Sequence, residues 1–141
     1  MNAASGDNGV RELVWTIKSS FLRYIETMPD GVISMYDGVT RDVEGFHFPL
    51  VSQTDSSWIF EGSVAFTGHF GMLAIEVGEV HIDVLDNVAS LSIADGDERL
   101  VFATGTFDGS RFDPIALTAD GADLFFEVYR RGEHLDPAIL V

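Results

Sequence analysis

The fold is decided by stretches such as GFHFPLV, residues 45–51, in which large apolar side chains alternate along the chain. Phe46 and Phe48 fall on one face of an extended chain and His47 on the other, because successive side chains of a strand point to opposite faces. The segment SVAF, residues 63–66, alternates in the same way. This period of two predicts strands with one face buried in a core.

Short segments of this kind recur through the middle of the chain. They are rich in β-branched and aromatic residues and are separated by Gly, Asp or Asn turns, as strands commonly are. The segments expected to be strands are Val32–Tyr36, Gly45–Val51, Trp58–Phe66, Leu73–Val77, Glu79–Leu85, Val88–Ile93 and Leu100–Thr106. Their number and length predict a mainly β domain, either an antiparallel β-sandwich or a partly open barrel.

Two short helices are expected to flank the strands. In residues 11–28 one 100° arc of a helical wheel contains Leu13, Ile17, Ser20, Phe21, Tyr24 and Met28, and a Pro-Asp-Gly sequence then ends the pattern. Ser20 and Tyr24 lie one turn apart in that arc, so two polar groups are expected on the buried face. The second helix is expected to begin at Thr118, a good N-cap, and to end at Gly132.

Composition bounds the function. The chain has 141 residues, 46% of them hydrophobic, which indicates one folded domain over residues 11–141 after a flexible segment, residues 1–10. The absence of cysteine excludes disulfides, iron–sulfur clusters and thiolate zinc sites. A net charge of −15 disfavours nucleic acid and anionic membranes as partners. Residues 1–10 show no secretory signal, and no apolar run is long enough to span a bilayer.

Two polar features are candidates for a site. The first is the Ser20 and Tyr24 pair, and the second is the sequence GHFG, residues 68–71, which centres on His69. A core tyrosine usually satisfies its hydroxyl with a nearby carbonyl, and a histidine between glycines can simply occupy a turn. Glycines on both sides of an imidazole also allow the backbone to approach a flat ligand closely. The residues alone leave both interpretations open.

Six blocks of the chain together resemble the HtaA-type haem-binding domain, the region repeated in haem-uptake proteins of actinobacteria. The blocks are LVWTIKSSFLRYI (13–25), GFHFP (45–49), GSVAFTGHFGML (62–73), LSIAD (91–95), ALTADGA (116–122) and YRRGEHLDP (129–137). They occur in the order of the family and span residues 13–137. A mainly β fold and a haem-binding function are what this resemblance implies.

The resemblance also implies roles for single residues. Tyr24 matches the axial ligand of a ferric haem b, His69 the histidine that hydrogen-bonds this tyrosine, Ser20 a serine near the propionates, and Tyr129 an aromatic that helps to enclose the haem. Val128 stands where an aromatic neighbour of that tyrosine is expected. The apolar slot for the macrocycle is expected from Phe21, Met28, Phe66, Phe70, Phe125 and Phe126. The cations expected to offset the propionate charge are Arg11, Lys18, Arg23, Arg130 and Arg131.

Chemistry agrees with these roles. A free tyrosine has a pKa of about 10, so it must become anionic to bind iron well. Ferric iron and a donating N–H of His69 both stabilise a phenolate, which favours the ferric state. A haem enzyme that consumes peroxide would need an acid–base pair on the open face, and no second histidine is placed to supply it. We therefore expect haem capture, transfer or transport without catalysis, with Tyr24 as the metal ligand.

The expected partners follow from the same resemblance. They are haem, other haem-transfer proteins of an uptake pathway and, in a homodimer, a second copy of the chain. The resemblance implies an extracellular or cell-surface location, although no signal or anchor is visible and a cytoplasmic location stays open. Two alternatives are a haem-free partner module of the same fold and a β-sandwich adhesion or calcium-binding module. Carboxylates for the calcium site would come from Asp83, Asp86, Asp95 and Asp97.

Overall fold

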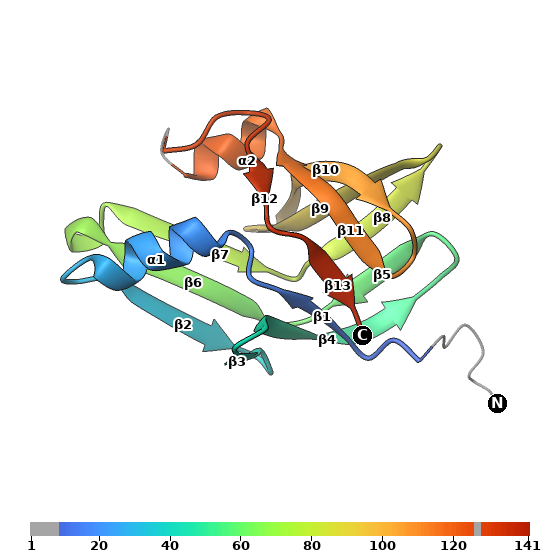
Figure 1. Ribbon diagram of the computed structural model, residues 1–141, viewed down its shortest axis with the longest axis horizontal. Coiled ribbons are helices and arrows are strands. Elements are labelled where there is room, and N and C mark those ends of the chain that lie inside the picture. The colour runs from blue at the N-terminus through green and yellow to red at the C-terminus, as the bar shows by residue number, and fades with distance from the viewer. Residues whose placement is uncertain (1–8, 126–127) are drawn as a thin grey trace.

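The computed structural model describes residues 9–125 and 128–141, most of which lie in strands (Figure 1). The helices are α1 (Ser19–Thr27) and α2 (Ala119–Leu124), with a short 3-10 turn η1 (His69–Gly71). The strands are β1 (Glu12–Trp15), β2 (Val32–Tyr36), β3 (Thr40–Asp42), β4 (Gly45–Gln53), β5 (Ser57–Phe60), β6 (Ser63–Gly68), β7 (Leu73–Gly78), β8 (His81–Leu85), β9 (Val88–Asp95), β10 (Glu98–Phe107), β11 (Arg111–Leu117), β12 (His134–Leu135) and β13 (Ala138–Leu140). The predicted mainly β class with two short helices is confirmed.

Among the described residues, eight antiparallel strands form a closed ring. Their order is β1-β13-β11-β10-β9-β8-β5-β4, and β4 pairs back with β1, which places Leu13 opposite Phe48 and Trp15 opposite Phe46. β3 adds to the free edge of β4, and β12 adds to β11. The ring leaves few open strand edges, because each strand has a neighbour on both sides for part of its length.

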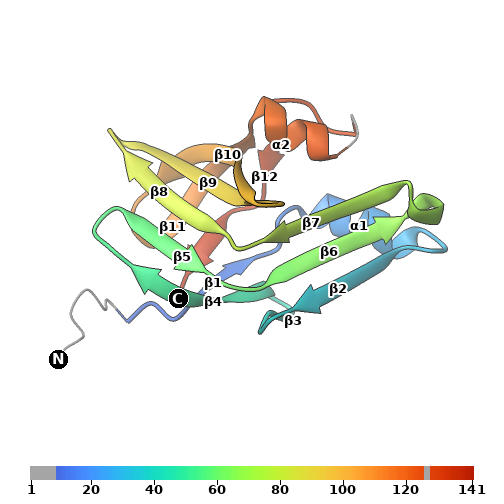
Figure 2. The same ribbon diagram turned by 180° about the vertical axis from the view of Figure 1, so that it is seen from behind.

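A second sheet, in the order β2-β6-β7, extends from one side of the barrel (Figures 1 and 2). α1 lies over this sheet and buries Phe21, Leu22 and Ile25. The Phe21 ring meets the ring of Phe66 on β6 edge to face, with 5.1 Å between the centroids. α2 packs on β10 and β11. Neither helix of the described residues is long and apolar enough to cross a membrane.

The predicted helix over residues 11–28 is wrong in its first half. Residues 12–15 form β1, the chain turns sharply at Ile17, where φ is +66°, and α1 begins only at Ser19. Leu13, Trp15 and Ile17 are fully buried, which is the period of two of a strand. Leu13 and Ile17 are also four residues apart, a spacing that fits a helix as well as a strand. The apolar positions alone therefore do not distinguish the two structures.

Asp136 holds the junction between β1 and α1. Its carboxylate accepts the backbone N–H of Ser19 at 2.8 Å and the hydroxyl of Thr16 at 2.5 Å. Its backbone N–H donates to the carbonyl of Ile17 at 2.9 Å, and its carbonyl accepts the indole N–H of Trp15 at 2.8 Å. Burial raises the pKa of the Asp136 carboxyl, but the hydrogen bonds from Ser19 and Thr16 outweigh burial and hold this pKa below its ordinary value. The start of α1 is therefore capped from the other end of the chain.

The second helix begins where the sequence predicts and ends sooner. The side-chain oxygen of Thr118 accepts the backbone N–H of Gly121 at 2.9 Å, so the predicted N-cap is confirmed. α2 ends at Leu124, so the predicted end at Gly132 is wrong. Gly132 has φ of +89° in the turn that leads to β12. The apolar positions after Leu124 continue the helical period, but the chain leaves the helix to meet β11.

The predicted strand over residues 58–66 is two strands. The break lies at Gly62, where φ is +89° and an added Cβ would lie 2.5 Å from the side chain of Val39. Only glycine adopts this conformation at such a close approach without strain. The break separates β5, which belongs to the barrel, from β6, which belongs to the second sheet.

Candidate functional site

α1 and the β6–β7 connection bring Tyr24 and His69 together at the end of the second sheet. The Tyr24 hydroxyl and Nε2 of His69 share a hydrogen bond of 2.6 Å. The Phe21 ring supports the Tyr24 ring from the buried side, with 6.3 Å between the centroids. Tyr24 is 38% exposed, so the expectation that it lies on a buried face is wrong. The buried face of α1 is the one toward β6, and Tyr24 projects past the edge of that face toward η1.

The turn η1 has an unusual backbone. His69 and Phe70 have φ of +50° and +56°, the left-handed region that L residues rarely occupy in succession. Gly71 follows with φ of +86°. This conformation directs the His69 imidazole to α1 and leaves the Phe70 side chain 96% exposed. Strained backbone of this kind clusters at functional sites, so η1 is a candidate for a binding turn.

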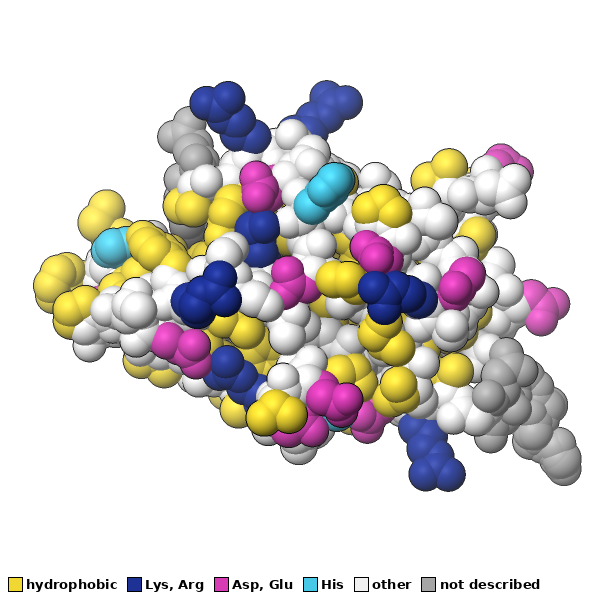
Figure 3. Space-filling view, in the orientation of Figure 1, with side chains coloured by type: hydrophobic (Ala, Val, Ile, Leu, Met, Phe, Trp, Pro, Cys, Tyr) yellow, Lys and Arg dark blue, Asp and Glu magenta, His cyan; other side chains and the backbone are white. Residues whose placement is uncertain are grey.

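The Tyr24 and His69 pair lies in an open groove of about 470 Å³. Its described lining consists of Tyr24, His69, Phe70, Met72, Leu73 and Val128. Figure 3 shows hydrophobic side chains gathered around a histidine at the end of the molecule formed by α1 and the β6–β7 connection. Apolar walls with a few converging polar groups are typical of small-molecule sites of this volume. Met72 and Leu73 are additions to the predicted set, and Val128 is the position at which an aromatic was expected.

The structure does not bring all the predicted residues to this groove. Ser20 is exposed on α1, so its expected burial is wrong, and Phe21 lies beneath Tyr24. Tyr129 lines a neighbouring groove of about 370 Å³, and its ring packs on Phe125 with 5.0 Å between the centroids. Phe126 lies outside the described residues, as do residues 1–8 of the segment expected to be flexible.

Cations surround the neighbouring groove. Nζ of Lys18 lies 5.1 Å from the centroid of the Tyr129 ring and 3.0 Å from a carboxylate oxygen of Glu133. Arg130 and Arg131 line the groove and are exposed. The same lining contains the carboxylate of Asp123, so its two arginines leave a small excess of positive charge, a local exception in a chain of net charge −15 that favours an anionic ligand group.

Another cavity, of about 670 Å³, lies elsewhere and has the opposite character. The acidic residues among its lining are Asp37, Glu61, Glu76, Glu79 and Asp95. Five carboxylates repel a dianionic ligand, and no tyrosine or histidine belongs to the lining described. Size alone therefore does not identify the site for the ligand that the sequence predicts.

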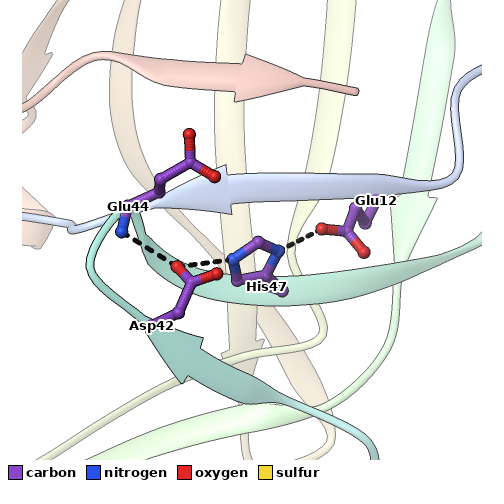
Figure 4. Close-up of polar contacts among 4 residues, drawn as sticks. All are labelled: Glu12, Asp42, Glu44 and His47. Carbon is purple, nitrogen blue, oxygen red and sulfur yellow. Dashed lines mark hydrogen bonds and ion pairs between the residues drawn. The ribbon is translucent and has the colours of Figure 1, made fainter.

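A second polar cluster lies where the barrel closes (Figure 4). Within residues 9–125 and 128–141, Asp42, Glu44 and His47 are the one group of three acidic or histidine side chains close enough to share an ion. Both imidazole nitrogens of His47 already meet carboxylates, Nδ1 that of Glu12 on β1 and Nε2 that of Asp42 on β3 at 2.9 Å. These hydrogen bonds raise the pKa of His47. The cluster therefore links three strands, β1, β3 and β4, and is called the clamp below. Among the described residues, the four aspartates considered for calcium do not form a group close enough to share an ion.

The fold and the groove define a class of protein, an antiparallel barrel with a side sheet that presents a tyrosine–histidine pair to an apolar groove. The model of the family described as Htaa matches residues 11–140, and the chain belongs to this family. No curated protein matches the chain.

Solved structures with the same fold come from Corynebacterium glutamicum. The N-terminal domain of HtaA is 24% identical, with a TM-score of 0.76 over 94% of this chain and 96% of that one. The C-terminal domain of HtaA is 23% identical, with a TM-score of 0.76 over 93% and 95%. The heme binding protein HtaB is 21% identical, with a TM-score of 0.74 over 93% and 91%. At these identities the likeness establishes the shared fold.

Proposed function

We propose that this protein binds one haem in the groove beside Tyr24 and passes it on without carrying out chemistry on it. The observation that carries the proposal is the hydrogen bond of 2.6 Å between the Tyr24 hydroxyl and Nε2 of His69. Membership of the Htaa family supports it, as does the shared fold with HtaB, a heme binding protein.

The pair suits ferric iron. When haem is bound, its ferric iron supplies a Lewis acid, for which a phenolate oxygen is a good ligand. Tyr24 provides that oxygen at the mouth of the groove, and an N–H of His69 stabilises the negative charge on it. The phenol is 38% exposed, so a flat ligand can reach it without unfolding α1. In this proposal Tyr24 is the metal ligand and His69 supports it.

The rest of the groove suits the other parts of haem. The exposed side chains of Phe70 and Met72 provide apolar surface for the macrocycle. Binding is favoured because the apolar surfaces of the side chains and of the macrocycle are both removed from water. Arg130 and Arg131 line the neighbouring groove, where their charges would complement the propionates. The acidic cavity offers neither property.

The open shape of the groove favours carriage over catalysis. Its described lining offers one tyrosine and one histidine, and these already bond each other. Peroxide cleavage would require a further acid–base pair on the opposite side of the macrocycle. An open groove would let haem leave readily, which would suit exchange with other haem-transfer proteins of an uptake pathway at the cell surface.

The test is a hemin titration of the purified protein, followed by its Soret absorption. We expect saturation at one hemin per chain, and transfer to an apo-acceptor of higher affinity without peroxidase activity above that of free hemin. A titration no different from that of hemin in buffer, or rapid peroxide turnover by the complex, would contradict the proposal.

A further inference from the structure

The carboxylate of Asp30 binds the backbone of the turn that carries His69. Its Oδ1 accepts the N–H of His69 at 3.2 Å, and its Oδ2 accepts the N–H of Phe70 at 2.6 Å. Asp30 is half-buried and lies in the turn directly after α1, the helix that carries Tyr24. One side chain therefore connects the two elements that supply the pair, which lie at the same end of the molecule (Figures 1 and 2).

The backbone of η1 explains why a carboxylate suits this position. Consecutive residues outside the ordinary helical and extended regions can point successive N–H groups to one side, where they form a small anion-binding concavity. His69 and Phe70 have φ of +50° and +56°, and their two N–H groups converge on the Asp30 oxygens. The negative charge stabilises a backbone conformation that non-glycine residues otherwise avoid.

A second contact to the same turn is weaker in kind. The sulfur of Met28 lies 3.3 Å from the N–H of His69, and an added Cβ on Gly68 would lie 2.2 Å from that sulfur. A thioether is a neutral and weak acceptor, so Met28 contributes mainly packing beneath Gly68. The hydrogen bonds that fix the orientation of the turn come from Asp30.

We infer that Asp30 is a positioning residue, whose carboxylate holds η1 in the one conformation that brings Nε2 of His69 to the Tyr24 hydroxyl. Without it the turn relaxes and the imidazole moves away from the phenol. Both of these hydrogen bonds of Asp30 go to backbone N–H groups and not to the side chains of Tyr24 and His69, which Asp30 aligns. The effect on haem rests on the proposed function, whereas the effect on the turn does not.

The first experiment uses the full chain without haem. Asp30→Asn keeps the size of the side chain and removes its charge, and Asp97→Asn is a matched control in the exposed turn between β9 and β10. We expect amide hydrogen exchange at Phe70 to accelerate about 10-fold or more in Asp30→Asn, because the variant loses a charge-assisted hydrogen bond. The side-chain ¹⁵N signals of His69 should shift in the same variant and stay unchanged in Asp97→Asn. Far-UV circular dichroism verifies that each variant is folded.

The second experiment uses hemin and the His69→Ala background. Asp30→Asn should speed hemin loss about 10-fold in the native chain and have a clearly smaller effect when His69 is already alanine, because only the positioning of Phe70 is then left to lose. Equal acceleration in both backgrounds would overturn the inference, as would unchanged Phe70 exchange and His69 signals in the haem-free variant. If the native chain binds no hemin but the haem-free signals change as expected, the proposed function fails and the positioning role stands.

Discussion

The hydroxyl of Tyr24 and Nε2 of His69 lie 2.6 Å apart, although the two residues are separated by 45 positions in the sequence. One belongs to α1 and the other to the turn between β6 and β7, so the pair forms only when the helix packs on the second sheet. The Phe21 ring fixes that packing against Phe66. The candidate ligand and its hydrogen-bond partner are thus a product of tertiary structure.

Removal of the imidazole should weaken haem retention without abolishing it. His69→Ala leaves Tyr24 able to bind iron but removes a charge-assisted hydrogen bond, which is worth about 1.5–3 kcal/mol or roughly 10- to 150-fold in affinity. His134→Ala removes an exposed histidine from β12 and serves as the control. Competition for hemin by an apo-acceptor measures the difference. Complete loss of binding in His69→Ala, equal to the loss in Tyr24→Phe, would instead favour the histidine as the iron ligand.

The exposed apolar wall of the groove should matter for binding and not for folding. Met72 is 81% exposed, so Met72→Ser should change the free energy of unfolding by less than about 0.5 kcal/mol. If haem covers this side chain, the loss of its burial weakens hemin binding by about 10-fold. Leu85→Ser removes a side chain that is 75% exposed on β8 and should leave hemin affinity unchanged. Equal affinities in all three proteins would show that haem does not cover Met72.

The clamp at the barrel closure predicts a stability that depends on pH. Hydrogen bonds that His47 donates to the carboxylates of Glu12 and Asp42 raise the pKa of His47 above its ordinary value of about 6.5. Protonated His47 therefore stabilises the fold fully below about pH 6.5, and this contribution is lost as the pH rises through the raised pKa. We expect the free energy of unfolding to decline by about 1 kcal/mol as the pH rises through this range. His47→Gln should abolish this decline, and His134→Gln should retain it. Urea unfolding between pH 5 and 9 measures it, and parallel curves for native protein and His47→Gln would contradict the prediction.

Asp136 should be a major contributor to stability. Asp136→Asn removes a charge that accepts hydrogen bonds from Ser19 and Thr16, so the free energy of unfolding should fall by about 1–3 kcal/mol at neutral pH. The pKa of Asp136 is lowered in the folded state, so its contribution is present above about pH 4 and is lost as the pH falls through the lowered pKa. The variant should lack this acid dependence. Asp97→Asn is the control, and an Asp136→Asn protein as stable as the native one would refute the prediction.

Much of the β scaffold could be predicted from the sequence because alternation survives in the barrel strands. The predicted strand over residues 32–36 has the same two bounds as β2. The strand that contains Phe46 and Phe48 extends only two residues further than predicted. The closing strand β1 was assigned to a helix because Leu13 and Ile17 satisfy both periods. Strands β3, β11, β12 and β13 do not belong to the predicted set. The last two have only two and three residues, too few for any period to appear.

Of the candidate site, the pairing of Tyr24 with His69 was predictable, whereas the place of Ser20 and the surroundings of the pair were not. Tyr24 and His69 were identified by the resemblance, and the structure places them within hydrogen-bond distance. No local pattern indicates that Asp30 binds the backbone at His69, since the contact spans 39 residues. The exposure of Tyr24 also depends on which face of α1 meets β6, and the predicted helix began at residue 11, eight residues before α1, which displaced that face.

The most direct test of the central claim is hemin binding by Tyr24→Phe, compared with the native chain and with Tyr36→Phe. Both variants lose one hydroxyl from a partly exposed tyrosine, but Tyr36 lies on β2 and does not belong to the described lining of the groove. If the Tyr24 oxygen holds the iron, Tyr24→Phe loses high-affinity ferric haem and its phenolate charge-transfer band, with the melting temperature and circular dichroism unchanged. Tyr36→Phe should bind hemin as the native chain does. An unchanged affinity and spectrum in Tyr24→Phe would contradict the claim.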